Sequence, residues 1–159
     1  MRPWRCRSAG VCVAVYCAAA FLNGFFINLR GPALPALARR VNTSLDNMGI
    51  FFLASSIGGS TAAVPSGLLV DRADGHPVLL LGLLLRTLTV AAVPWAATTL
   101  GVLAVIAGFQ GVSNPLIVTP ARTMIVRLAG LDSASLLSVT TAFFGLGSVA
   151  APVCFSFAV

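Results

Sequence analysis

Long apolar runs, separated by short polar stretches, dominate the pattern of this chain. A helix that crosses the roughly 30 Å hydrocarbon layer of a bilayer needs about 20 consecutive, mostly apolar residues. Five segments satisfy this requirement, and they cover residues 9–29, 47–70, 77–95, 99–120 and 135–159. The pattern therefore predicts an all-α polytopic transmembrane bundle of about five helices over residues 9–159, preceded by a short segment of residues 1–8.

The sequence also indicates how these spans are joined and packed. Residues 30–46 form the one long connection, with two prolines and room for a short helix at the membrane interface. Small residues recur at helical spacing in the second, fourth and fifth spans, among them Gly58, Gly108 and Gly147. Small residues let helix backbones approach closely in lipid, so the pattern favours a packed bundle over separate anchors.

Composition excludes several classes of protein. Of the 159 residues, 58% are hydrophobic and only 9% are charged, whereas a soluble domain has about 25% charged residues. The charged residues are ten Arg and four Asp, too few to solvate a globule, so a soluble enzyme, a disordered chain and a secreted disulfide scaffold are excluded. The net charge of +6 comes from arginines near the ends of apolar runs, which indicates a lipid bilayer as partner and not a nucleic acid.

The arginines near the spans predict the orientation, because cytoplasmic flanks carry the excess of basic residues. An inside N-terminus places six of them in the cytoplasm, namely Arg2, Arg5, Arg7, Arg72, Arg122 and Arg127. Three lie on the opposite side, namely Arg30, Arg39 and Arg40. This bias predicts a cytoplasmic N-terminus, residues 1–8, and places Arg122 and Arg127 at the cytoplasmic end of the fourth span. The plasma membrane is the default location.

Five of the polar residues inside the apolar runs are candidates for a substrate cavity, because a polar group is costly in lipid. They are Asn23, Asn28, Arg86, Gln110 and Asn114. For the amides, hydrogen bonding between helices is the alternative role. Arg86 can pair with an Asp, extend to the membrane surface or face a water-filled cavity, and no Asp lies inside an apolar run.

Groups for enzymatic chemistry are scarce. The chain has a single His, His76, no Glu, and Asp only in loops or near helix ends, so a hydrolytic triad, a metal cluster and a carboxylate pair are unsupported. Its cysteines form no CxxC pair, and it has no Walker A sequence for ATP. We therefore expect no enzymatic activity, no metal and no cofactor.

The segment between the second and third spans reads Gly-Leu-Leu-Val-Asp-Arg-Ala-Asp-Gly-His-Pro over residues 67–77. Its Asp-Gly pair suits a tight reversal of the chain at the membrane surface. Gly67 lets another helix come close, and Asp71 is an anion that can meet a helix N-terminus or an arginine.

This segment resembles the cytoplasmic motif of the major facilitator superfamily, in which G-x-x-x-D-R/K-x-G-R/K-R/K joins the second and third helices. Gly67, Asp71 and Arg72 are in register, while the next glycine is one position late and a His-Pro pair replaces the basic pair. In the superfamily this Asp helps to latch the two halves in one conformation. The resemblance implies the same role for Asp71, with a partner in a second half.

Three more segments are similar to the fucose-permease and sodium-dependent glucose transporter branch of the superfamily, namely residues 31–38, 127–130 and 143–152. The likeness covers residues 12–159. The branch is expected to carry an acidic residue and an Asn near positions 118 and 122 of the fourth helix, where this chain has Val118 and Arg122.

The resemblance implies an architecture and a function. Superfamily transporters have twelve helices in two halves that bind solute between them, so this chain is expected to be an N-terminal piece, an incomplete half. It would need the missing C-terminal half or a partner chain. The implied function is transport of a small solute, a sugar being the expected class, by alternating access with H⁺ or Na⁺ as candidate coupling ion. The alternatives are a non-transporting multi-span protein with an assembly or structural role, and an oligomeric channel.

Overall fold

The structure, a computed structural model, describes residues 9–130 and 133–158, and within these ranges it contains helices and no strand. The long helices are α1 (Ala9–Asn28), α3 (Gly49–Arg72), α4 (Gly75–Ala96), α5 (Leu100–Ala129) and α6 (Ser133–Ala158). Each of these five is long and apolar enough to cross a membrane. The prediction of an all-α polytopic bundle is therefore confirmed. The predicted segment of residues 1–8, with its three arginines, lies outside the described residues.

The first predicted loop is mostly helical. Helix α2 (Arg30–Arg40) follows α1 almost directly, and a short 3₁₀ helix, η1 (Asp46–Met48), leads into α3. The prolines explain why α2 forms a separate element, because a proline removes a backbone donor and disfavours continuation of a preceding helix.

Helix α5 extends well beyond the predicted span of residues 99–120. It continues through Pro115 and Pro120 and ends at Ala129, where Gly130 adopts a positive φ of 54°. Prolines are tolerated inside membrane helices when neighbouring groups satisfy the freed carbonyls. The predicted end at Pro120 is therefore wrong for this helix, and Arg122 and Arg127, predicted to mark its end, lie within it.

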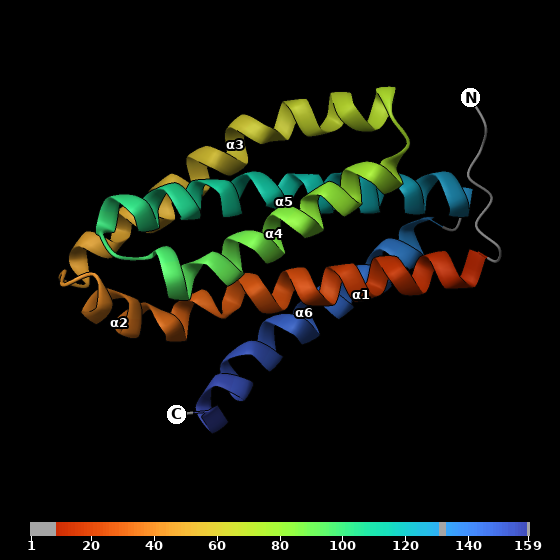
Figure 1. Cartoon of the computed structure of the whole chain (residues 1–159). Coiled ribbons are helices and arrows are strands. Elements are labelled where there is room, and N and C mark those ends of the chain that lie inside the picture. Colours follow the sequence, from red (N-terminus) through yellow and green to blue (C-terminus); the bar gives the residue numbers. More distant parts are fainter. Residues whose placement is uncertain (1–8, 131–132, 159) are drawn as a thin grey trace.

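Helix α5 is the central element of the bundle (Figure 1). It packs along α3 and α4, while α1 packs along α6. Contacts of α5 with α1 and α6 join these two groups of helices. Helix α6 crosses α1 at an angle, and its C-terminal end lies apart from the other helices (Figure 1). One apolar cluster, with Tyr16, Leu79 and Ile117 at its centre, joins α1, α4 and α5.

Glycines stand where the helix backbones come closest. A Cβ atom added at Gly58 would collide with the Gly108 carbonyl of α5, and one added at Gly147 would collide with the Phe21 carbonyl of α1. In lipid no hydrophobic effect drives helices together, so close packing of this kind holds the helices against each other. The outward faces carry large apolar side chains such as Val64 and Leu88, which are 71% and 66% exposed within the chain. Such surfaces suit contact with lipid.

Candidate functional site

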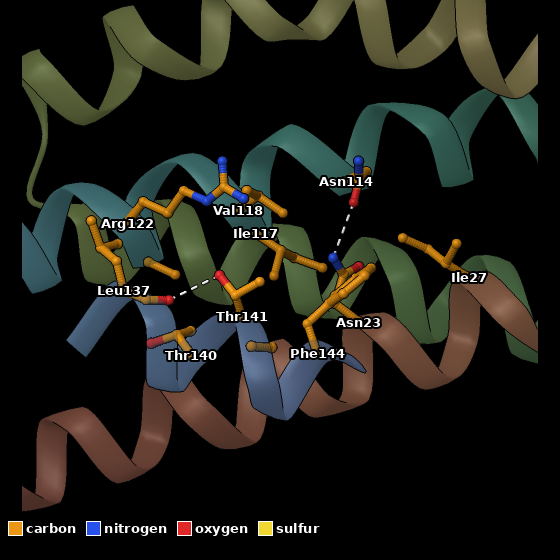
Figure 2. Close-up of a pocket in the computed structure, with 12 residues that line it drawn as sticks. Asn23, Ile27, Asn114, Ile117, Val118, Arg122, Leu137, Thr140, Thr141 and Phe144 are labelled. Atoms are coloured by element: carbon orange, nitrogen blue, oxygen red, sulfur yellow. Dashed lines mark hydrogen bonds between the residues drawn. The ribbon is translucent and has the colours of Figure 1, made fainter. Parts of the chain in front are cut away.

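A cavity of about 260 Å³ lies between α1, α5 and α6. Its lining comprises Ala20, Asn23, Ile27, Asn114, Ile117, Val118, Ala121, Arg122, Leu137, Thr140, Thr141 and Phe144. Figure 2 shows Asn114 and Arg122 on the same helix toward opposite ends of the cavity, with Thr141 of α6 between them. The walls are mostly apolar with a few polar groups, which is the usual make-up of a small-molecule site.

A chain of hydrogen bonds crosses three helices beside this cavity. Arg86 of α4 donates from Nη2 to Oδ1 of Asn23 on α1, over 3.2 Å. Asn23 donates in turn from Nδ2 to Oδ1 of Asn114 on α5, over 3.1 Å (Figure 2). An arginine can only donate, so the Asn23 oxygen must face Arg86 and its amide nitrogen must face Asn114. The direction of this series of hydrogen bonds, from Arg86 through Asn23 to Asn114, is therefore fixed.

Arg86 is deeply buried, with only 2% of its surface exposed. Its Nε and Nη1 atoms have no hydrogen-bond partner among the described residues. Neither a partner Asp nor extension to the membrane surface, two of the roles expected for it, is present within residues 9–130 and 133–158. The guanidinium is therefore charged, buried and only partly satisfied.

Arg30, a second arginine near this region, is held more completely. It donates from Nη1 to the Ser55 hydroxyl over 2.9 Å and stacks over the Phe51 ring, 5.6 Å from its centroid. Burial lowers the pKa of Arg30 from its ordinary value. These contacts join the start of α2 to α3, and they leave Arg30 with partners that Arg86 does not have.

The segment between α3 and α4 forms an ion pair with α5. Asp71, in the last turn of α3, lies 3.9 Å from Arg127 between Oδ1 and Nη2. Their side chains are 74% and 49% exposed, so the pair adds little stability. Arg72 ends the same helix. A Cβ atom at Gly67 would meet nothing within 4 Å in the described chain, so no helix described here uses the room that this glycine leaves.

The family follows from comparison with known sequences. A model of the Major Facilitator Superfamily matches residues 16–159. The chain belongs to this superfamily. It is 29% identical over 138 residues to Sodium-dependent glucose transporter 1 of Homo sapiens, and 29% identical over 136 residues to the Rattus norvegicus protein of that name. Each alignment covers 85% of this chain.

The chain spans 26% and 28% of the lengths of these two relatives, about a quarter of each. No solved structure matches it. Membership in the Major Facilitator Superfamily, together with five helices suited to crossing a bilayer, makes this a multi-pass integral membrane protein. The predicted resemblance is thus confirmed for the superfamily, and the similarity to the two relatives agrees with the predicted likeness to the glucose-transporter branch.

The structure brings together only some of the five candidate cavity residues. Asn23 and Asn114 line the cavity and bond to each other. Arg86 does not line the cavity but donates a hydrogen bond to Asn23. Asn28 instead donates to the Gly24 carbonyl and to the Ser148 hydroxyl of α6, which is the interhelical alternative. Gln110 lines a separate cavity of about 100 Å³. A solute-binding role for any of them remains a prediction.

The cavity is also lined by Arg122, Thr140 and Thr141, which the sequence pattern had not singled out. Arg122 was placed at the end of the fourth span, whereas in this superfamily member it lies inside a continuing helix. Asn114, Val118 and Arg122 are spaced four residues apart, so they share one face of a helix. That spacing was the available signal, and the predicted end at Pro120 concealed it.

The ion pair of Asp71 is with an arginine, one of the two kinds of partner expected for it, and this arginine is Arg127 of the same chain. The partner in a second half that the resemblance implied stays a prediction. In this superfamily member the ion pair of the motif therefore connects α3 to α5 within the described residues.

Proposed function

We propose that this chain forms part of a transporter that moves a small solute across a membrane by alternating access, the solute belonging to the sugar class. The cavity between α1, α5 and α6, with the Asn23–Asn114 pair in its wall, carries the proposal. The glucose transporters that resemble the chain over 85% of its length support the solute class.

The lining suits a hydroxylated solute. Thr140 and Thr141 donate to the carbonyls of Leu136 and Leu137 in their own helix, so their oxygens keep a free lone pair to accept from a solute hydroxyl. Apolar walls such as Ile117 and Phe144 would cover the carbon face of a sugar ring.

The Asp71–Arg127 pair fits a conformational role in this transporter. It is exposed and weak, so a movement of α3 relative to α5 can break it at little cost. We assign Gly67, Asp71 and Arg72 to a motif that holds one conformation, and we place the pair on the cytoplasmic side, with a cytoplasmic N-terminus in the plasma membrane. H⁺ or Na⁺ would be the coupling ion, and the dependence on sodium in the names of the relatives supports Na⁺.

Uptake into liposomes tests the function. The native polypeptide that contains this sequence is reconstituted, and uptake of labelled D-glucose is followed with and without an inward Na⁺ gradient. We expect saturable uptake that Asn23→Ala reduces at least tenfold, because a direct polar contact to solute is lost. Asn47→Ala is the matched control, since Asn47 lies in η1, bonds to Thr43 at the surface and does not line the cavity.

Three outcomes would contradict the proposal in different ways. An ohmic conductance with no saturation would indicate a channel. No uptake of any neutral or charged small solute by folded protein would indicate a non-transporting multi-span protein. Equal loss in Asn23→Ala and Asn47→Ala would remove the cavity from the transport pathway.

A further inference from the structure

The cavity is positively charged, and no described residue that lines it carries a balancing negative charge. Arg122 lines the cavity directly, and the Arg86 guanidinium lies behind Asn23 in its wall. The sequence has no Glu and four Asp residues. Asp46, Asp71 and Asp74 lie at or next to helix ends, and Asp132 lies outside the described residues. No carboxylate is among the described residues that line the cavity.

Arg86 intensifies this imbalance. Two of its three nitrogens have no partner in the part of the chain described, and the side chain is 2% exposed. A buried charge without a counter-charge is strongly destabilising, and at membrane depth such a group usually marks a binding or transport path. The second cation at the cavity, Arg122, has no hydrogen bond or ion pair with any described residue that could neutralise it.

The hydrogen bonds beside the cavity have a consistent direction. Arg86 donates to Asn23, and Asn23 donates to the oxygen of Asn114. The Asn114 amide nitrogen is left to donate to another group, because its oxygen is already occupied. The cavity therefore offers donors at two places on α5, Asn114 and Arg122, and the charge of Arg86 polarises the first of them.

A small anion fits this arrangement better than a carboxylate side chain from another transmembrane segment. The unpaired nitrogens of Arg86 are already covered by the helices of this chain, so a further helix could not reach them without displacing α1, α4 or α5. A small solute in the cavity can contact Arg122 and Asn114 directly. The charge of Arg86 attracts an anionic solute indirectly, because Asn23 lies between them. The threonine oxygens on α6 supply acceptors for hydroxyl groups of the same solute.

We propose that the cavity binds a small hydroxylated carboxylate, such as a sugar acid, with the carboxylate paired to Arg122 and stabilised by the donor chain that begins at Arg86. This inference rests on the proposed function, because it takes the cavity as the solute site. It changes the solute from a neutral sugar to an anionic relative of one. Arg122 determines the specificity, and Arg86 acts as a positioning residue through Asn23.

The test compares pairs of ligands in which a carboxylate replaces a hydroxymethyl group. D-glucuronate is set against D-glucose, and D-glycerate against glycerol, with the Na⁺ concentration and ionic strength matched by NaCl. Binding is read as the rise in the melting temperature of the purified native polypeptide in detergent, and transport as uptake into liposomes. We expect at least one carboxylate to raise the melting temperature more than its neutral counterpart and to be taken up saturably.

Variants locate the effect. Arg122→Gln should weaken carboxylate binding roughly tenfold or more, because one charged hydrogen bond is lost, while Arg122→Lys keeps part of it. Arg86→Met should lower carboxylate affinity with little change for the neutral counterpart, a difference that a merely structural role would not produce. Arg39→Gln is the matched control, since Arg39 is exposed and does not line the cavity.

The outcomes separate this inference from the proposed function. Saturable uptake of glucose, with no carboxylate preferred and no effect of Arg122→Gln, would overturn the inference and leave transport intact. Carboxylate binding that Arg122→Gln abolishes, without uptake of either class, would support the site and contradict transport. If no carboxylate binds better than its neutral counterpart in the unmodified protein, the inference is wrong.

Discussion

Asp71 at the end of α3 pairs with Arg127 near the end of α5, with 3.9 Å between Oδ1 and Nη2. The two residues are 56 positions apart in the sequence, and neither is buried. The pair joins the two helices that the chain packs against each other most extensively. Because it is exposed, its contribution to the free energy of unfolding is at most about 1 kcal/mol. The role we propose for the pair is to favour one conformation over another, because even a small free energy shifts populations.

Neutralising Asp71 should impair transport far more than stability. We expect Asp71→Asn to abolish most solute uptake in reconstituted native polypeptide while lowering the free energy of unfolding by less than about 1 kcal/mol. Uptake assays and thermal unfolding in detergent measure the two effects. Exchange of the charges in the double variant Asp71→Arg, Arg127→Asp should restore part of the uptake.

Asp74→Asn is the control for this prediction, because Asp74 lies in the same segment and forms no ion pair among the residues described. It should transport normally. Normal uptake by Asp71→Asn would contradict the conformational role. Equal loss in both variants would assign the effect to the total charge of the segment.

The contact of α1 with α6 should depend on one of two neighbouring glycines. Gly147→Ala places a Cβ atom against the Phe21 carbonyl of α1, whereas Gly145→Ala places one in open space. We expect Gly147→Ala to lower the free energy of unfolding by about 1–3 kcal/mol through overpacking. Gly145→Ala should be neutral or stabilising, by up to about 1 kcal/mol, because alanine favours the helix.

Thermal unfolding of the two variants in the same detergent checks this difference. The pair is a stringent comparison because both positions lie on α6 only two residues apart. Similar melting temperatures for the two variants would show that α6 does not cross α1 at Gly147.

Much of the fold follows from the sequence because lipid imposes a simple rule. A chain that must satisfy its backbone in hydrocarbon forms helices about 20 residues long or longer, so apolar runs predict both number and type of element. The end of α5 was the exception. Proline usually ends a helix in water, but α5 continues past Pro120 to Ala129. Inside a membrane helix proline is tolerated, and this applies to Pro120.

The candidate site was only partly accessible to the same reasoning. Asn23 and Asn114 could be singled out because amides at membrane depth are costly, and both line the cavity. The hydrogen bond between them could not be predicted, because they are 91 residues apart and no sequence rule tells which faces of α1 and α5 meet. The same limit applies to Arg86 and Asn23, which are separated by 63 residues.

The predicted orientation can be tested with single cysteines. With the N-terminus inside, Ala73, between α3 and α4, is cytoplasmic, and Thr98, between α4 and α5, is outside. In a background whose native cysteines are replaced, we expect a membrane-impermeant maleimide to label Thr98→Cys in intact cells. It should label Ala73→Cys only after the membrane is permeabilised. The reverse pattern would show that the N-terminus is outside, and labelling of neither in intact cells would point to an internal membrane.

The last prediction concerns Arg86, which is buried, and Arg30, which is partly buried, and which should respond in opposite ways to the same substitution. Arg86→Met removes a buried charge with two unpaired nitrogens, at the expense of one hydrogen bond to Asn23. Arg30→Met removes a satisfied group that bonds to Ser55 and stacks on Phe51. In ligand-free protein we expect Arg86→Met to raise the free energy of unfolding by about 1–3 kcal/mol, and Arg30→Met to lower it by about 1–2 kcal/mol.

Chemical denaturation in detergent, with all small carboxylates dialysed away, measures both changes. Leucine at position 86 provides a second apolar variant, so that a packing defect specific to methionine can be recognised. A clear loss of stability in Arg86→Met and Arg86→Leu alike would mean that Arg86 already has an anionic partner in the ligand-free protein. The positive charge of Arg86 would then be balanced by a group of the protein itself. Arg86 would no longer support an anionic solute.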